Sequence, residues 1–376
     1  MRAARKGLYT RRVCDALGFP FVMDGRKGNM RTGCCRNLLT FIVLAAMFPA
    51  SAAAIEHSVV PLRELSPLAA RDQIAHRLLS PLARREYERV VASGHLRIHD
   101  QDIATGQEHY DLYAPDAPGD SALGLVVFVS PSDDFRLPPG WGKVLDRERL
   151  VLVSARNSGN SRSMLGRRVP LALHGYDYAV GRYRIDPERV YIAGFSGGGR
   201  TAQLIAFAYP DVFRGVLMFA GSDPFGEGAV PPPPRELMGL LQDRLRIVQS
   251  TGLADEVNIA IDGRMRRSMD RMCIRNVAHV DQPRLGHGLP GAVGFSRALA
   301  ALLEPVEAGG DNEACNARLQ ARIDAALAQV DDLIVGGKPV EARTQLQQVD
   351  AEYGWLAAPQ SVELMERIDA QAPEQQ

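Results

Sequence analysis

Residues 190–200 read VYIAGFSGGGR and join an apolar, strand-like run to the start of an apolar helix. Within them, Gly194–Gly198 form the pattern G-x-S-x-G around Ser196. Between a strand and a helix such a turn is so sharp that the residues two before and two after the serine nearly touch, which favours glycine at both positions. The stretch therefore predicts that Ser196 is a nucleophile exposed above the end of a buried strand.

Short apolar runs on either side of this stretch predict further strands that are buried on both faces. These runs lie at residues 123–130, 150–155, 216–220, 246–250 and 274–280. Segments of helical composition alternate with them, near 165–183, 197–209, 235–243, 256–272 and 291–304. Strands and helices in alternation predict an α/β fold with a mostly parallel sheet and helices on both faces.

Three segments flanking this pattern carry weaker signals. Residues 55–94 have helical composition, and residues 95–99 and 108–114 predict a β-hairpin. Four consecutive prolines, Pro231–Pro234, exclude helix and central strand. They predict a rigid surface segment before the next helix, or alternatively a short polyproline stretch that binds a partner.

A change in composition at residues 309–311 begins a purely helical region that reaches residue 376. Apolar residues spaced by three and four run from Leu319 to Ile334 and from Ala342 to Tyr353. Gly336 and Gly337 separate the two runs, so the pattern predicts a helical hairpin, and a third helix is compatible with the sequence after Pro359. One such unit weakly resembles a tetratricopeptide repeat and is too short to be stable alone. We expect it to pack on the domain at 55–308 and to offer a surface to a protein partner.

The first 54 residues have the composition of a leader. A stretch that begins at Met30 combines basic residues, the apolar run Leu38–Phe48 and the small residues that follow it, which is typical of a secretory signal peptide. Met30 is then the predicted start, and the mature protein is expected to be secreted or periplasmic. The apolar run is too short for a lasting membrane span.

Removal of this leader would leave two cysteines, Cys273 and Cys315. An even pair of cysteines in an exported protein predicts a disulfide bond. This bond would close a loop of about 42 residues and stabilise the fold by roughly 4 kcal/mol. Two separate buried thiols are the alternative.

Charge and motifs exclude several classes of function. The chain has 44 basic and 44 acidic residues, and because the leader is basic, the remainder is mildly acidic. An acidic body offers no field for phosphate backbones, so no nucleic-acid partner is expected. The sequence contains no HExxH, no paired CxxC and no phosphate-binding G-x-x-x-x-G-K, so neither a metal nor a nucleotide cofactor is predicted.

The run IDPERVY at 185–191, leading into GFSGGG, resembles the α/β-hydrolase superfamily. It is most similar to secreted esterases of the polyhydroxyalkanoate depolymerase-like and feruloyl-esterase-like branch, over roughly residues 123–303. The resemblance implies the α/β-hydrolase fold. It also implies that an acid and then a histidine follow the nucleophile along the chain.

The family pattern places the acid at Asp255, after the strand at 246–250. Glu256, the next residue, remains an alternative. So does Asp223, since some hydrolases place the acid after the preceding strand. The loop LGHGLP at 285–290 resembles the family's histidine loop, which makes His287 the general base.

An oxyanion hole requires two N–H donors. One is expected from Gly197 and the other from Ser130 or Ser132, because Pro131 between them has no N–H. A second serine motif, GDSAL at 119–123, precedes a strand and is interpreted as a turn.

Together these features predict a secreted serine hydrolase that cleaves small or polymeric carboxylic esters through a Ser-His-Asp acyl-enzyme mechanism. The segments 133–146 and 155–170 are expected to shape its substrate pocket. A serine peptidase with the same triad is an alternative. So is a secreted binding or assembly protein built on a hydrolase scaffold.

Overall fold

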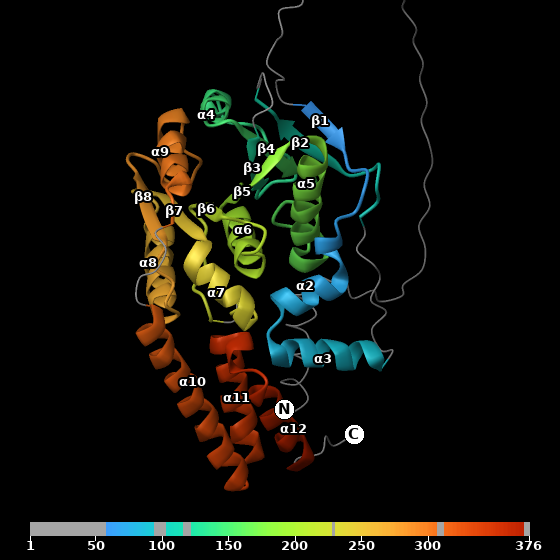
Figure 1. Cartoon of the computed structure of the whole chain (residues 1–376), viewed down its shortest axis with the longest axis vertical. Coiled ribbons are helices and arrows are strands. Elements are labelled where there is room, and N and C mark those ends of the chain that lie inside the picture. Colours follow the sequence, from blue (N-terminus) through green and yellow to red (C-terminus); the bar gives the residue numbers. More distant parts are fainter. Residues whose placement is uncertain (1–57, 94–102, 116–121, 228–229, 307–311, 372–376) are drawn as a thin grey trace, which may run out of the picture.

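The computed structural model describes residues 58–93, 103–115, 122–227, 230–306 and 312–371 (Figure 1). The predicted leader at 1–54, with its signal peptide and the start at Met30, lies outside the described residues. The same holds for the predicted strand at 95–99.

One eight-stranded sheet forms the centre of the molecule, in the order β1-β2-β4-β3-β5-β6-β7-β8. The strands are β1 (Ser58–Pro61), β2 (His109–Tyr113), β3 (Leu123–Val129), β4 (Leu150–Ala155), β5 (Ile185–Phe195), β6 (Gly215–Phe219), β7 (Arg246–Gly252) and β8 (Val277–Gln282). Strands β1 and β2 are antiparallel to their neighbours, and all other pairs are parallel. The predicted mostly parallel sheet is therefore confirmed.

Helices cover both faces of this sheet (Figure 1). They are α2 (Arg71–Leu78), α3 (Pro81–Ala92), α4 (Trp141–Glu148), α5 (Val169–Arg182), α6 (Gly197–Ala208), α7 (Arg235–Arg244), α8 (Glu256–Arg271), α9 (Ala292–Leu303), α10 (Asn312–Val335), α11 (Pro339–Tyr353) and α12 (Gln360–Gln371). Short 3-10 turns lie at Pro67–Ala69 and Gly354–Ala357, and a π-helical turn at Met164–Arg168. Among the described residues, no helix is long and apolar enough to cross a membrane.

Alternate residues of the central strands enter two separate cores. On β3, Leu125 and Val127 pack with α5 and α6, whereas Val126 and Phe128 pack with α4 and α9. Because both faces are covered, apolar side chains fill most positions of these strands, and the strands read as nearly continuous apolar runs. This is why they could be predicted from the sequence.

Several segments differ from the sequence prediction, among them α4, which no predicted helical segment covered. Residues Ser58–Pro61 form strand β1, although helix was expected throughout 55–94. Strand β1 pairs antiparallel with β2, so the partners of β2 in the structure are β1 and β4. The reason is tertiary: four residues at the sheet edge satisfy their backbone groups by pairing, which overrides a weak helical composition.

The sequence predicted that Pro231–Pro234 form a surface segment. This prediction is wrong, because the prolines lie largely buried in the structure. The turn that ends α11 packs against it, and the Trp355 N–H donates to the Pro232 carbonyl at 3.2 Å. A side chain at Gly354 would strike Pro232, so glycine permits this close approach. The sequence pattern could not show that distant residues would cover the prolines.

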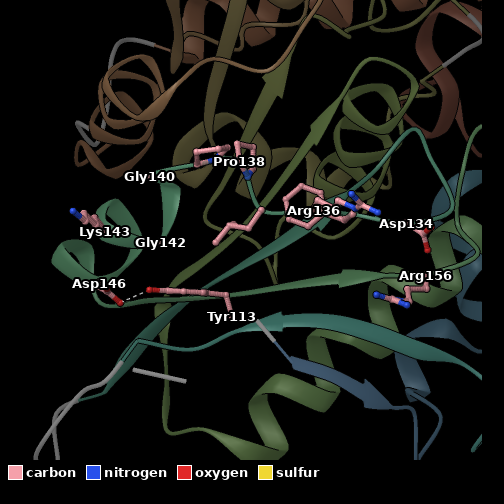
Figure 2. Close-up of a pocket in the computed structure, with 12 residues that line it drawn as sticks. Tyr113, Asp134, Arg136, Pro138, Gly140, Gly142, Lys143, Asp146 and Arg156 are labelled. Atoms are coloured by element: carbon pink, nitrogen blue, oxygen red, sulfur yellow. Dashed lines mark hydrogen bonds between the residues drawn. The ribbon is translucent and has the colours of Figure 1, made fainter. Parts of the chain in front are cut away.

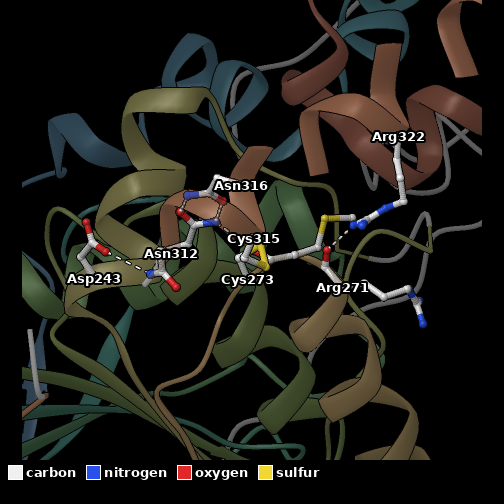
Figure 3. The surroundings of a disulfide bond; sticks show 9 residues. Asp243, Arg271, Cys273, Asn312, Cys315, Asn316 and Arg322 are labelled. Atoms are coloured by element: carbon white, nitrogen blue, oxygen red, sulfur yellow. Dashed lines mark hydrogen bonds between the residues drawn. A yellow bond between two sulfur atoms is a disulfide. The ribbon is translucent and has the colours of Figure 1, made fainter. Parts of the chain in front are cut away.

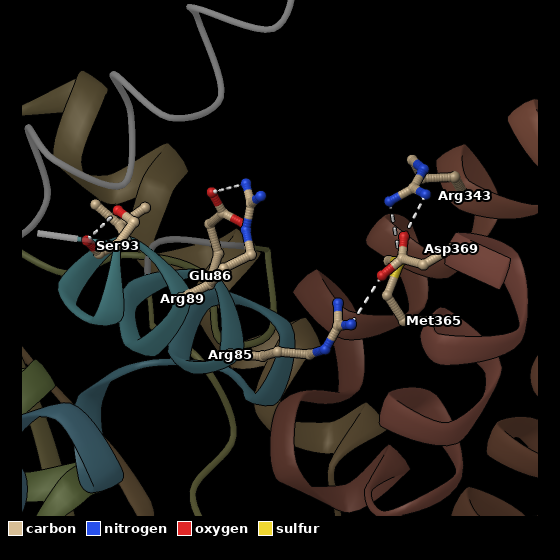
Figure 4. A network of polar contacts seen from close by, with 8 residues as sticks. Arg85, Glu86, Arg89, Ser93, Arg343, Met365 and Asp369 are labelled. Carbon is tan, nitrogen blue, oxygen red and sulfur yellow. Dashed lines mark hydrogen bonds and ion pairs between the residues drawn. The ribbon is translucent and has the colours of Figure 1, made fainter. Parts of the chain in front are cut away.

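The C-terminal helices α10, α11 and α12 share a hydrophobic core with α2, α3 and one face of the sheet. This confirms the expected packing of the helical hairpin on the rest of the chain, and α12 supplies the third helix. At the edge of the interface, Asp369 of α12 binds both Arg343 of α11 and Arg85 of α3 (Figure 4). The division into domains at 55–308 and 309–376 stays a prediction.

A disulfide bond joins Cys273 and Cys315, with their Cα atoms 5.9 Å apart, as the sequence predicted. It connects the turn after α8 to the first turn of α10 (Figure 3). Beside it, the amides of Asn316 and Gln242 bind each other through two hydrogen bonds, and Arg322 donates to the Arg271 carbonyl. The bond and these contacts tie α10 to α7 and α8.

Candidate active site

Ser196 lies on a tight turn between β5 and α6, with φ 53° and ψ −122°. A Cβ atom at Gly194 would strike the Gly198 carbonyl, and one at Gly198 would strike the Val129 carbonyl. Glycine is therefore required at Gly194 by the contact within the turn that the sequence predicted, and at Gly198 by the close approach of the end of β3. The geometry leaves Ser196 at the N-terminus of α6, where the helix dipole favours negative charge.

The structure brings together three of the residues predicted from the sequence. His287 Nε2 lies 2.9 Å from Ser196 Oγ, and His287 Nδ1 lies 2.7 Å from an oxygen of Asp255. With the imidazole proton on Nδ1 facing the carboxylate, Nε2 is free to accept the serine hydroxyl proton. The side chain of Phe195 packs beside the imidazole, with the ring centres 5.0 Å apart.

Asp255 is buried at the N-terminus of α8. Burial alone would raise the pKa of its carboxyl group, but hydrogen bonds from His287 and Asn258 outweigh this and lower the pKa. The Asn258 amide donates to both carboxylate oxygens, at 3.0 and 2.8 Å. The carboxylate is therefore held ionised and in a fixed orientation toward the imidazole.

The two alternative acids lie elsewhere. Asp223 binds Arg200 at 3.2 Å, and burial raises the pKa of Asp223 although the arginine opposes this. Glu256 is exposed on the first turn of α8. In this structure Nδ1 of His287 is hydrogen-bonded to Asp255 and to neither of the alternative acids.

The loops expected to form the oxyanion hole lie next to Ser196. Gly197 begins α6 and has the side chain of Asn160 packed against it. Ser130 is buried, and its hydroxyl accepts the Ser132 N–H at 3.0 Å. The Ser132 N–H would have to leave this acceptor in order to bind an oxyanion, so the roles of Gly197, Ser130 and Ser132 stay predictions.

Sequence reasoning missed three residues of this region: Asn160, Arg168 and Asn258. Asn258 follows Asp255 by three positions, the spacing at which a helix N-cap and its N3 residue bind each other. That spacing could have drawn attention to it. Nothing in the local sequence distinguishes Asn160, or separates Arg168 from the neighbouring Arg167.

A cavity of about 850 Å³ lies between β2, α4 and the loop after β3 (Figure 2). Its walls combine aromatic, charged and small residues: Tyr113, Asp134, Phe135, Arg136, Leu137, Pro138, Pro139, Gly140, Gly142, Lys143, Asp146 and Arg156. Most of them belong to the segment 133–146 that was expected to shape the substrate pocket, whereas 155–170 contributes Arg156. Within the described part of the chain, no three His, Cys, Asp or Glu side chains gather closely enough to hold a metal ion.

A mostly parallel sheet with a serine on a strand–helix turn, followed along the chain by an acid and a histidine, is the arrangement of α/β-hydrolases. The chain has the fold and the serine turn of this superfamily. Within it, residues 168–233, which include the serine turn, match the model of the esterase PHB depolymerase family. The sequence relatives of this chain are named as esterases and other hydrolases.

Two of these relatives differ in the reaction for which they are named. A 2-hydroxy-6-oxononadienedioate/2-hydroxy-6-oxononatrienedioate hydrolase of Paraburkholderia phymatum is 27% identical over 50% of this chain and 62% of its own length. Feruloyl esterase B of Talaromyces funiculosus is 25% identical over 33% of this chain and 32% of its own. The chain thus spans less than two thirds of these relatives. A solved S-formylglutathione hydrolase of Agrobacterium tumefaciens aligns with a TM-score of 0.39 and 15% identity, over 56% of this chain and 94% of that one.

Proposed function

We propose that the protein is a serine hydrolase that cleaves carboxylic esters through an acyl-enzyme intermediate. The observation that carries the proposal is the hydrogen-bonded series Ser196–His287–Asp255 at the end of the parallel strands. The similarity to esterases favours an ester over an amide as the substrate. The same triad geometry would serve a peptidase, so the experiment below includes amides.

In the first half-reaction, Ser196 Oγ attacks the ester carbonyl carbon while His287 Nε2 accepts the hydroxyl proton. Negative charge then develops on the carbonyl oxygen, near the N–H of Gly197 and the N-terminus of α6. Asp255 stabilises the imidazolium and keeps its Nδ1 proton directed inward. Collapse of the intermediate breaks the ester C–O bond, and Nε2 gives its proton to the departing alcohol.

In the second half-reaction, water replaces the alcohol. His287 Nε2 removes a proton from the water as its oxygen attacks the acyl carbon, and the same proton then returns to Ser196 Oγ. The products are a carboxylic acid and the free enzyme. Apart from this water, no group outside the chain and the substrate is needed for the balance of atoms.

The substrate pocket and the location of the protein are part of the proposal. The cavity beside α4 is large enough for a small ester or for one unit of a polymer, but its lining includes none of Ser196, His287 and Asp255, so it would hold a part of the substrate remote from the reacting carbonyl. Export is supported by the leader composition and by the disulfide bond, which persists in oxidising compartments. N-terminal sequencing of the exported protein should find a mature chain that begins near residue 53 or 55.

The first test replaces the nucleophile. Ser196→Ala should lower the hydrolysis of short activated esters by roughly a thousandfold or more and abolish labelling by a fluorophosphonate, with thermal stability unchanged. Ser296→Ala, which removes a hydroxyl that binds Arg147 on the surface, serves as the control. An ester and an amide of the same acyl group separate esterase from peptidase activity. Full activity of Ser196→Ala would refute the proposal.

A further inference from the structure

Arg168 is a buried cation at the end of the π-helical turn Met164–Arg168. It is 3% exposed, and no ion pair with a carboxylate holds it among the described residues; its burial is the cause of a pKa lowered to about 10. The side chain is therefore still charged at neutral pH. Burying a charge without a counter-ion is costly, so the fold must compensate by hydrogen bonds.

Its neighbours in the sequence behave differently. Arg162 binds Asp133 and Arg167 binds Glu108, so each has a carboxylate partner. Arg168 instead donates to three backbone carbonyls. Nε binds Ser158 O at 2.9 Å, Nη2 binds Ser130 O at 3.3 Å and Nη1 binds Gly197 O at 3.4 Å.

These carbonyls belong to three different strand ends. Ser130 follows β3, Ser158 lies in the loop after β4, and Gly197 follows the nucleophile at the end of β5. Two of the three are residues from which oxyanion donors are expected. The guanidinium thus holds the loop after β3 and the first turn of α6 at a fixed separation.

We propose that Arg168 is a positioning residue of the oxyanion hole. It holds the carbonyls of Ser130 and Gly197, one peptide beyond the N–H expected to donate from each of these residues, and sets a positive charge beside them. The inference rests on the function proposed above. The planar guanidinium of Arg168 can reach three acceptors at once, which a lysine ammonium on a flexible stem cannot do with the same geometry. A charge in a water-poor site interacts more strongly with an oxyanion than with a neutral carbonyl. The effect should therefore appear in the transition state and leave the binding of substrate little changed.

The test compares Arg168→Met and Arg168→Lys with the unaltered protein. Arg168→Met should lower kcat for a short activated ester by about thirtyfold, with KM within about threefold, and Arg168→Lys should recover part of the loss. Arg77→Met is the matched control, because Arg77 is a half-buried arginine that also binds a backbone carbonyl, at Ala208, away from Ser196. If circular dichroism shows that Arg168→Met does not fold, Arg168→Lys provides the test, and its kcat should fall by several-fold.

Two inhibitors separate positioning from general damage. The Ki of an alkyl boronic acid, which forms a tetrahedral anion on the serine, should rise by the same factor as kcat falls. The Ki of a planar, neutral amide analogue should stay constant. An equal change in both constants, or no change in either, would overturn the inference. Labelling of the unaltered protein at Ser196 by a fluorophosphonate is scored separately, since its failure would refute the proposed function itself.

Discussion

Asn258 is the residue that links the acid to the helix on which it lies. Its amide nitrogen donates to both oxygens of Asp255, and its amide oxygen faces Arg200 at 3.4 Å. The arginine thereby favours the amide orientation that directs the NH₂ group toward the carboxylate. Asn258 acts on the imidazole through the carboxylate, as a positioning residue.

Removal of this amide should weaken catalysis without abolishing it. Asn258→Ala leaves Asp255 with the His287 bond and a longer bond, of 3.4 Å, from the backbone N–H of residue 258. It removes both side-chain bonds that orient the carboxylate, so we expect kcat for a short ester to fall by about tenfold. Steady-state kinetics with an activated ester provide the measurement. Asn316→Ala, which removes an amide at the distant α10–α7 contact, should leave kcat unchanged. An unchanged kcat in Asn258→Ala would show that the amide has no positioning role.

The choice of acid can be tested at the same scale. Asp255→Asn should reduce kcat by orders of magnitude, because an amide at this position favours the wrong imidazole tautomer. Asp223→Asn should have little effect on kcat, since Asp223 binds Arg200 and not His287. His287→Ala should be nearly as damaging as loss of Ser196. A severe loss in Asp223→Asn with an active Asp255→Asn would reverse the assignment.

Among the elements, those determined by local pattern could be predicted and those determined by distant contacts could not. The runs at β3 and β4 are apolar because both sheet faces are covered, and Gly194 is required by its contact with the Gly198 carbonyl within the same turn. The burial of Pro231–Pro234 depends on the turn after α11, more than 100 residues away. For Asn258 the spacing to Asp255 was visible in the sequence, but the direction of its side-chain amide depends on the distant Arg200.

The contact between α11 and α3 should make stability depend on pH. Asp350 accepts hydrogen bonds from the Ser80 hydroxyl and, at 3.1 Å, from the Leu82 N–H. Burial raises its pKa to about 6 despite these bonds. The folded state therefore favours the protonated form of Asp350. Below about pH 4 this contributes roughly 2–3 kcal/mol to the free energy of unfolding, and the contribution is lost as the pH rises through 6.

Asp350→Asn removes this titration. The free energy of unfolding of Asp350→Asn, minus that of the unaltered protein, should be about 2 kcal/mol larger at pH 7.5 than at pH 4.5. Urea unfolding of both proteins at both pH values measures it. Asp324→Asn, at an exposed position of α10, is the control and should show no such gain. An equal difference between Asp350→Asn and the unaltered protein at both pH values would contradict the prediction.

At the scale of the whole molecule, the disulfide bond joins the C-terminal helices to the sheet-bearing part. Replacing both Cys273 and Cys315 by serine should lower the free energy of unfolding by about 4 kcal/mol, because the unfolded chain regains the entropy of a loop of 42 residues. Guanidinium unfolding of the oxidised protein and of the double variant gives the difference. Thiol titration of the unfolded, unreduced protein should find no free thiol at these positions, and two would contradict the bond.

The Trp355 indole donates to the Leu79 carbonyl, 276 positions earlier in the chain, and helices from both ends enter the same core. A ribosome releases the N-terminal helices α2 and α3 long before α11 exists. During synthesis, the apolar faces of these two helices therefore lack the partners that cover them in the finished protein. The part of the core that α2 and α3 share with α11 therefore cannot form until α11 has been made.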